Sequence, residues 1–380
     1  MSSIVRICFL YCLMLLALPA SAVDMPLPEP PSFNGKSFVL MDFHSGQLLA
    51  GQQTELRIQP ASITKLMTAY ILFSELKSGN LKLEDSVTIS EKAWRTGGSR
   101  MFVNVGSQVR LEDMLRGMII QSGNDATVAL AETVAGSEET FAELMNQYAQ
   151  KLGMRNSRFT NSHGLDDEGH YSTASDIALL SRALIHDFPE HYKYYNERKF
   201  TYNNITQHNR NGLLGRDGVD GIKTGHTDSA GYCLVASAQR GDMRLIAVVT
   251  GTESMKARER AAAALLTYGF RFYETSKLYD PSQPIDHVRV WKGQPPQLPI
   301  GVGQALYVTI PRGNRKNLSV AAQVQEQILA PVAAGQSLGS ITVQLSGETI
   351  RQEPLVALQA VSLGSWWRRL SDALRMKLQR

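Results

Sequence analysis

The stretch Pro60-Ala61-Ser62-Ile63-Thr64-Lys65-Leu66-Met67-Thr68 places a serine and a lysine three residues apart at the start of an apolar segment. Proline is well tolerated in the first turn of a helix, because its missing N–H would have no partner there. Apolar residues then recur with helical spacing through about Leu76, which predicts a helix. Ser62 therefore lies in the first turn, where backbone N–H groups point outward and favour developing negative charge.

The spacing also gives Ser62 a neighbouring base. Residues three apart share a helix face, so the Lys65 amine can reach the Ser62 hydroxyl, and a serine hydroxyl needs such a base to act as a nucleophile. Lysine can serve only if its pKa falls from about 10.4 to about 7–8. Burial and a second cation can lower it, and Lys223 is the natural candidate for that cation. Ser74-Glu75-Leu76-Lys77 has the same spacing, but a solvated helix face explains it.

Two further short motifs follow, Ser122-Gly123-Asn124 and Lys223-Thr224-Gly225. With Ser62-Ile63-Thr64-Lys65 they match the signature of penicillin-binding proteins and serine β-lactamases. This resemblance implies that Ser62 is the nucleophile, that Ser122 relays a proton to the departing amine and that Asn124 holds the substrate amide.

The third motif is expected on a strand that forms the far wall of the site, with Thr224 facing the substrate carboxylate and Gly225 beside it. The resemblance implies an oxyanion hole made by the backbone N–H groups of Ser62 and of a residue just past the triplet, His226. One such donor contributes about 3–4 kcal/mol of transition-state stabilisation.

Longer blocks resemble the D-alanyl-D-alanine carboxypeptidases among the low-molecular-mass penicillin-binding proteins, from about Phe38 to Thr275 and more loosely beyond. The similar blocks are Pro60 to Thr68, Gln121-Ser122-Gly123-Asn124-Asp125-Ala126, His208-Asn209-Arg210-Asn211-Gly212-Leu213-Leu214 and Val219-Asp220-Gly221-Ile222-Lys223-Thr224-Gly225-His226-Thr227. The resemblance implies an α+β domain of the β-lactamase/transpeptidase type, in which an antiparallel sheet is flanked by helices.

The same resemblance implies a peptidoglycan pentapeptide substrate ending in D-Ala-D-Ala, an acyl-enzyme resolved by water, and covalent inhibition by β-lactam antibiotics. It implies no cofactor and no metal. Arg210 is expected to help Thr224 bind the terminal carboxylate, although by residue type alone it fits a surface position equally well. Asp176 is expected to pair with Lys223 or His226, although an acid in the first turn of a helix also has a purely structural explanation.

Related activities remain as alternatives. Class A β-lactamases carry a glutamate about 34 residues after the second motif for deacylation; here that position falls near Arg158, and the next acid, Glu168, precedes Gly169-His170. A penicillin-binding sensor without useful turnover, and an endopeptidase, would share the three motifs. The loop from Trp94 to Met101 is shorter than expected for the family, which bears on substrate preference or acyl-enzyme lifetime.

Other polar residues have simpler explanations. His163 and His170 lie seven residues apart with acids between them, form no metal-binding motif and are interpreted as loop residues. Cys233 stands in an apolar stretch and is expected to be a buried small side chain rather than a nucleophile.

The N-terminus predicts export. Arg6, the apolar run Ile7 to Leu18 and Ala20-Ser21-Ala22 fit a cleaved signal peptide over residues 1–22. That apolar run is too short to span a bilayer comfortably, although an uncleaved anchor is the alternative. Cys8 and Cys12 fall in this segment. A proline-rich leader is expected over residues 23–35.

Alternating apolar residues predict strands at Lys36 to Asp42, Gln47 to Ala50, Ala230 to Ala238 and Arg244 to Thr250. Apolar residues with helical spacing predict helices over Gly123 to Val134, Glu138 to Leu152, Ser175 to Ile185 and Met255 to Tyr273. The catalytic domain is therefore expected over residues 36–280 and a small all-β domain over 281–358.

Residues 359–380 are expected to form an amphipathic helix. Leu363, Trp366, Trp367, Leu370, Leu374 and Leu378 follow helical spacing, with basic residues on the other face. Formal net charge is +4, and residues 366–380 account for the excess, which argues against a nucleic-acid surface spread over the fold. Such a helix lies in a membrane interface; packing on the β domain is the alternative. The expected location is the periplasmic face of the inner membrane, with the oligomeric state left open.

Overall fold

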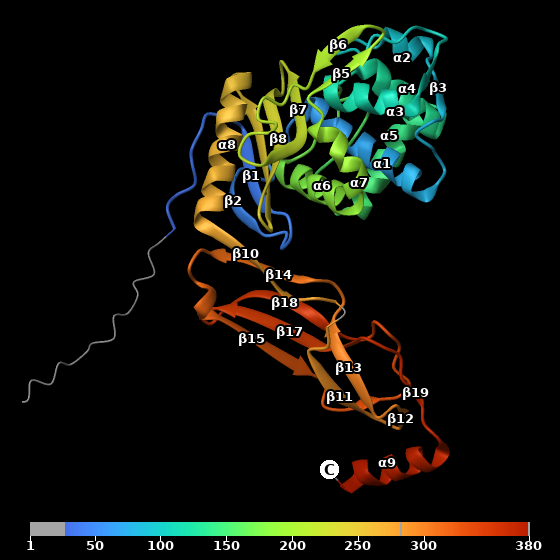
Figure 1. The fold of residues 1–380 in the computed structure, drawn as a ribbon, viewed down its shortest axis with the longest axis vertical. Helices are drawn as coiled ribbons and strands as arrows, with labels where there is room; N and C mark the ends of the chain where they lie inside the picture. Colours follow the sequence, from blue (N-terminus) through green and yellow to red (C-terminus); the bar gives the residue numbers. More distant parts are fainter. Residues whose placement is uncertain (1–26, 282, 379–380) are drawn as a thin grey trace, which may run out of the picture.

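The computed structural model describes residues 27–281 and 283–378, arranged as two domains and a C-terminal helix (Figure 1). The signal peptide expected over residues 1–22 lies outside the described residues, as do Cys8, Cys12 and the first part of the leader. No helix within the described ranges is long and apolar enough to cross a membrane.

An antiparallel five-stranded sheet in the order β2-β1-β9-β8-β7 forms the centre of the first domain. Its strands are β1 (Ser37–Asp42), β2 (Leu48–Gln52), β7 (Val219–Thr227), β8 (Gly231–Arg240) and β9 (Met243–Thr252). Along β1, Phe38 and Leu40 enter one apolar core and Val39 and Met41 the other. The sheet is therefore buried on both faces, and the expected antiparallel sheet flanked by helices is confirmed.

One face of the sheet is covered by α8 (Met255–Phe272), and the other by a cluster of helices (Figure 1). The cluster contains α1 (Lys65–Ser78), α2 (Glu91–Arg95), α3 (Leu111–Arg116), α4 (Asn124–Ala135), α5 (Glu138–Lys151), α6 (Ala174–Asp187) and α7 (Pro189–Tyr192). Two short two-stranded antiparallel sheets lie at its edge, β3 (Ser86–Thr88) with β4 (Gln108–Arg110), and β5 (Lys199–Tyr202) with β6 (Ile205–His208).

The second domain is all β around a separate apolar core. Its main sheet has the order β15-β17-β18-β13-β11-β16. The bounds are β11 (Asp286–Trp291), β13 (Gln297–Val302), β15 (Leu318–Val324), β16 (Ile328–Leu329), β17 (Ser337–Leu345) and β18 (Glu348–Ala357). A separate pair joins β10 (Tyr273–Tyr279) to β14 (Leu306–Pro311). This pairing crosses the boundary expected at 280/281, because β10 precedes it and β14 follows it.

The domains share a buried polar junction. Thr275 donates to Asp42 Oδ2 at 2.7 Å, and the hydroxyls of Ser45 and Thr309 lie 2.7 Å apart. Arg351 also donates to the carbonyl of Ser45 at 2.6 Å. Buried hydrogen bonds are costly to break without replacement, so this junction holds the two domains in a defined relation.

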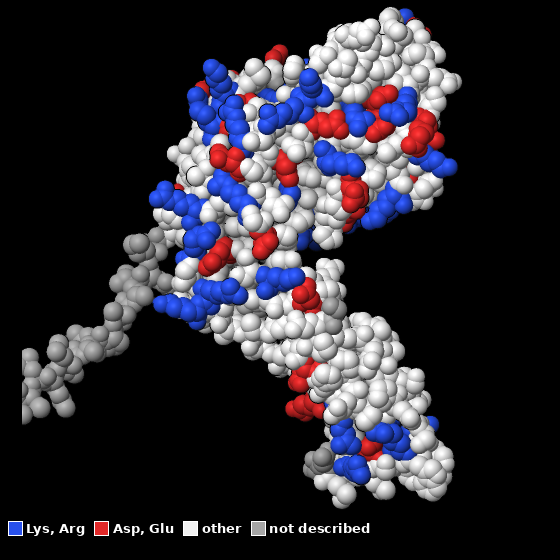
Figure 2. All heavy atoms as spheres, in the orientation of Figure 1, with Lys and Arg blue, Asp and Glu red and all other residues white. Residues whose placement is uncertain are grey.

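The chain ends in α9 (Trp366–Leu378), at the far end of the second domain (Figure 1). One side of α9 docks through Asp372, which is buried, lies 3.1 Å from Arg289 and accepts the N–H of Lys292 at 2.7 Å. The six predicted apolar positions remain exposed, with Trp367 at 66%. Lysine and arginine side chains also gather at this end (Figure 2). The helix therefore contacts the β domain through a polar side chain and leaves its apolar face open.

Candidate active site

A cleft of about 480 Å³ opens at the junction of helices and sheet. Seven residues selected from the sequence line it: Ser62, Ser122, Asn124, Arg210, Thr224, Gly225 and His226. Lys65 and Lys223 are buried beneath them. Three motifs that begin at Ser62, Ser122 and Lys223, far apart along the chain, thus form one site, as their order predicted.

Ser62 stands on a single turn of 3₁₀ helix, Ala61–Thr64, that leads directly into α1. The predicted helix therefore begins as a tighter turn, closed by the N–H of Ile63 on the carbonyl of Pro60 at 3.1 Å. Ala61 has φ +48° and Ser122 has φ +66°, a backbone region that non-glycine residues rarely occupy. Such strained residues cluster at functional sites; Ala61 directly precedes the nucleophile, and Ser122 lines the same cleft.

Lys65 lies at the centre of the buried polar contacts. Its Nζ is 3.0 Å from Ser62 Oγ, 2.7 Å from Asn124 Oδ1 and 2.7 Å from the carbonyl oxygen of His163. Carbonyl and amide oxygens only accept hydrogen bonds. A neutral amine has two N–H groups and one lone pair, so donation to these two oxygens leaves the lone pair facing the Ser62 hydroxyl.

Burial and, to a smaller extent, the nearby Arg210 guanidinium lower the pKa of Lys65 to about 7, against the opposing charges of Asp125 and Glu138. Arg210 is thus a cation beside Lys65 that the sequence did not suggest, in addition to Lys223, which also interacts with Lys65. Arg210 projects from a loop far along the chain, so its proximity depends on the fold. Near neutral pH a substantial fraction of Lys65 is unprotonated, as a general base requires.

Ser122 and Lys223 form the second polar pair. A π-helical turn, Gly117–Gln121, ends at Ser122 and turns its hydroxyl toward the cleft, and Lys223 Nζ lies 2.9 Å from Ser122 Oγ. Burial, together with the charges of Lys65, Arg210 and Arg258, lowers the pKa of Lys223 well below its usual value. A proton shared between Lys223 and Ser122 is therefore available for transfer.

The edge strand β7 forms the far wall of the cleft, as expected. Gly225 packs so closely on the Ser62 turn that an added Cβ would lie 3.0 Å from the carbonyl oxygen of Pro60. The neighbouring Thr224 lines the cleft, and His226 lies over Tyr232 with ring centroids 4.0 Å apart.

Asp176 is not part of this constellation. It is buried in the first turn of α6, where it accepts hydrogen bonds from the N–H of Asn156 at 2.8 Å and the hydroxyl of Ser157 at 2.7 Å. The expected pairing with Lys223 or His226 is wrong, because the Asp176 carboxylate binds Asn156 and Ser157 instead. Asp176 ties the beginning of the segment between α5 and α6 to the first turn of α6.

Sequence reasoning missed three residues beside the site. Arg258, on α8, is buried, lines the cleft and donates to the carbonyl of Gly225 at 3.3 Å. His163 and His170 do lie in a loop, but both are buried against the Ser62 turn, and His170 Nε2 is 2.8 Å from Thr64 Oγ1. The spacing of the two histidines matches no metal-binding motif, and whether a loop is buried cannot be read from the sequence.

The comparisons with known proteins agree with this geometry. The sequence profile of the family described as D-alanyl-D-alanine carboxypeptidase matches residues 25–254. A second profile, described as the C-terminal domain of penicillin-binding protein 5, matches residues 273–362. The D-alanyl-D-alanine carboxypeptidase DacC of Escherichia coli (strain K12) is 46% identical over 374 residues, which cover 96% of this chain and 93% of that protein. The chain belongs to the D-alanyl-D-alanine carboxypeptidase family.

Solved structures of related proteins match this fold over most or part of the chain. Penicillin-binding protein 5 from Haemophilus influenzae is 41% identical, with a TM-score of 0.84 over 88% of this chain and 99% of that one. Penicillin-binding protein D2 from Listeria monocytogenes, solved in the ampicillin-bound form, is 29% identical, with a TM-score of 0.58 over 63% of this chain and 100% of that one. The family resemblance and the fold class predicted from the sequence are confirmed.

Proposed function

We propose that this protein is a serine-type carboxypeptidase that removes the terminal D-alanine from peptides ending in D-Ala-D-Ala, through an ester on Ser62. The observation that carries the proposal is the buried Lys65 amine, whose two carbonyl partners aim its lone pair at the Ser62 hydroxyl. Membership of the family supplies the substrate class. The cell-wall pentapeptide is the substrate that combines this chemistry with an exported chain.

In the proposed acylation, Lys65 takes the Ser62 proton as Oγ attacks the carbonyl of the penultimate D-alanine. Backbone N–H groups of Ser62 and His226 hold the oxyanion. The C–N bond then breaks, and the Lys223–Ser122 pair, joined at 2.9 Å, gives a proton to the departing amine. Thr224 and the Arg210 guanidinium hold the carboxylate of the leaving D-alanine.

Deacylation repeats the chemistry with water in place of the serine. The proton that Lys65 took from Ser62 first replaces the one given up by the Lys223–Ser122 pair, so Lys65 is neutral again. Water then attacks the ester carbonyl and gives a proton to the amine of Lys65; the C–O bond to Ser62 breaks, and the oxygen of Ser62 recovers a proton from Lys65. The shortened peptide leaves with a new carboxylate. A β-lactam enters the same first step, because opening of its ring by Ser62 Oγ forms an equivalent ester.

One observation favours the carboxypeptidase over a β-lactamase. Among the residues that the structure describes, no Asp or Glu lines the cleft, and Asp166, on the nearby loop, is occupied by the hydroxyls of Thr227 and Ser229 at 2.7 and 2.6 Å. A lactam-derived ester therefore has no carboxylate base beside it for rapid hydrolysis.

The test combines two substrates with one variant. The purified protein and Ser62→Ala are incubated with a D-Ala-D-Ala-ended peptide and, separately, with labelled penicillin. Release of D-alanine and stable labelling, both lost in Ser62→Ala, are the expected results. Labelling without D-alanine release would indicate a sensor, and rapid loss of penicillin would indicate a lactamase; either result would contradict the proposal.

We also propose that the protein is exported and rests on the outer surface of the cytoplasmic membrane through α9. Support comes from the signal-like residues 1–22, the open apolar face of α9 and its basic residues. Each basic residue near anionic lipid contributes about 1 kcal/mol. Sedimentation with anionic vesicles is expected for the full chain and not after deletion of residues 361–380, which should leave D-alanine release intact. Unchanged sedimentation of the deletion variant would refute the anchor.

A further inference from the structure

The loop from Asn161 to Leu165 packs directly on the turn that carries Ser62. Gly164 has φ +87°, and a Cβ built there would overlap the carbonyl oxygen of Ala61. The loop supplies the His163 carbonyl that accepts from Lys65 at 2.7 Å. One of the two oxygens that orient the amine therefore belongs to a loop and not to a helix or strand.

Successive peptide groups of this loop are held by side chains. The carbonyl of Ser162 accepts from Thr68 Oγ1 at 2.6 Å, and the N–H of Ser162 donates to Glu138 Oε1 at 3.1 Å. The N–H of Gly164, in the same peptide group as the His163 carbonyl, donates to Asn161 Oδ1 at 2.7 Å. The orientation of that carbonyl is thus fixed by its neighbours.

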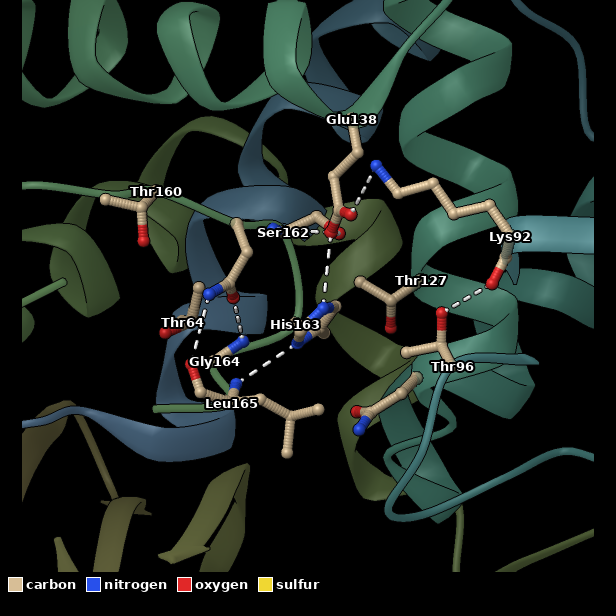
Figure 3. Close-up of polar contacts among 12 residues, drawn as sticks. Thr64, Lys92, Thr96, Thr127, Glu138, Thr160, Ser162, His163, Gly164 and Leu165 are labelled. Carbon is tan, nitrogen blue, oxygen red and sulfur yellow. Dashed lines mark hydrogen bonds and ion pairs between the residues drawn. The ribbon is translucent and has the colours of Figure 1, made fainter. Parts of the chain in front are cut away.

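Glu138 is the charged group beneath the loop. It is the first residue of α5, its side chain is 8% exposed, and the Ser162 hydroxyl donates to Oε1 at 2.6 Å. Figure 3 shows Lys92 reaching this carboxylate from one side and the His163 ring from the other, at 3.1 and 3.4 Å. One carboxylate therefore meets both the backbone and the ring next to the Lys65 acceptor.

The ring of His163 has a defined tautomer. Its Nδ1 accepts the N–H of Leu165 at 3.1 Å (Figure 3), so in the neutral ring the proton is on Nε2, which faces Glu138. Burial, reinforced by the charge of Lys65, lowers the pKa of His163 to about 4, so the ring is neutral at pH 7.

We propose that Glu138 and His163 are positioning residues for the base. They hold the loop so that the His163 carbonyl meets the Lys65 amine, and the carboxylate of Glu138 supplies negative charge near that amine. The inference rests on the proposed role of Lys65 as the base for Ser62. Neither side chain touches the substrate in this account, and both act through Lys65.

The negative charge of Glu138 affects the pKa of Lys65 in a definite direction. Burial opposes its ionisation, but hydrogen bonds from Ser162 and the nearby His163 and Lys92 lower the pKa of Glu138, which is therefore ionised at neutral pH. The charged and titratable groups around Lys65 are Arg210, Asp125, Glu138, Lys223 and His163. Of these, Glu138 and Asp125 raise the pKa of Lys65, so loss of the Glu138 charge lowers it.

The experiment compares Glu138→Gln with Glu139→Gln. Glu139 is the next residue of α5, is 76% exposed on its side chain and contacts the same Lys92 at 2.6 Å, so it is a matched control for charge and sequence position. The rate of acylation by labelled penicillin is measured from pH 5 to 9, per site that can be acylated. This normalisation removes any effect of a smaller folded fraction.

For Glu138→Gln we expect the rate above pH 7 to fall roughly fivefold and the acid limb of the profile to move down by roughly half a pH unit. Glu139→Gln is expected to keep both values. An acid limb and rate equal to those of Glu139→Gln would overturn the inference. A purely structural role would lower the thermal midpoint without moving the acid limb, which would also overturn it.

Ser162→Ala provides a second variant should Glu138→Gln fail to fold. It removes one hydrogen bond to Glu138 while keeping the charge, so the rate should fall with the acid limb unmoved; an unchanged rate would overturn the positioning role. If the unmodified protein shows no Ser62-dependent acylation, the proposed function itself fails. Normal acylation by the unmodified protein and by all three variants would overturn only the inference.

Discussion

Replacing Lys65 with Met tests whether the buried amine is neutral at working pH, because methionine has a similar length and does not titrate. Burial lowers the pKa of Lys65 from 10.5 to about 7. Between these values the unfolded chain binds more protons than the folded one, so the Lys65 contribution to the free energy of unfolding rises with pH. From pH 7 to pH 9 the gain is about 2 kcal/mol.

The assay is urea unfolding of the unmodified protein and Lys65→Met at pH 7, 8 and 9. Loss of hydrogen bonds to Asn124 and His163 is a cost that does not depend on pH, so it cancels from the change between pH values. The charge of Lys65 also lowers the pKa of Lys223. In Lys65→Met the pKa of Lys223 is therefore higher, and the stability of the variant rises less with pH for this reason too. The free energy of unfolding of the unmodified protein, minus that of the variant, should increase by at least about 2 kcal/mol from pH 7 to pH 9. A constant difference would refute a neutral Lys65.

Three further predictions concern the surroundings of the site. Gly164→Ala should lower the free energy of unfolding by more than about 2 kcal/mol in urea, because the added Cβ overlaps the carbonyl oxygen of Ala61 at a positive φ. Arg210→Gln should raise KM for a peptide with a free terminal carboxylate by roughly tenfold or more. It should also move the acid limb of acylation upward, because Arg210 lowers the pKa of Lys65; an unmoved limb would contradict this. Cys233 is buried and burial raises the pKa of its thiol, so mass spectrometry should find it alkylated by iodoacetamide at pH 8 only after unfolding.

Local patterns in the sequence predicted most of the first domain. Strands β1, β8 and β9 and the helices α4, α5, α6 and α8 lie within a few residues of their predicted bounds, because turns and apolar periodicity are local signals. The boundary expected at 280/281 separates β10 from its partner β14, which lies about thirty residues further on. Pairing over that distance leaves no local signal in the sequence, whereas the proline-containing segment after β10 resembles a linker.

The residues of the candidate site that belong to a sequence motif could be predicted. Those whose role depends on how deeply the fold buries them could not. Ser62, Lys65, Ser122 and Lys223 meet as their motifs imply. The pairing expected of Asp176 is wrong, because its carboxylate binds Asn156 and Ser157, a contact set by the packing of a loop. The depth of His163, the cation beside Lys65 and the carboxylate of Glu138 all depend on contacts between distant segments.

The most direct test of the account asks which serine becomes acylated. The purified protein is exposed to labelled penicillin, digested, and its peptides are sequenced by mass spectrometry. The chain contains two serines three residues before a lysine within one helical segment, Ser62 and Ser74. We predict one adduct per chain, on Ser62, and none in Ser62→Ala. An adduct on Ser74 or another residue, or labelling that persists in Ser62→Ala, would contradict the central claim.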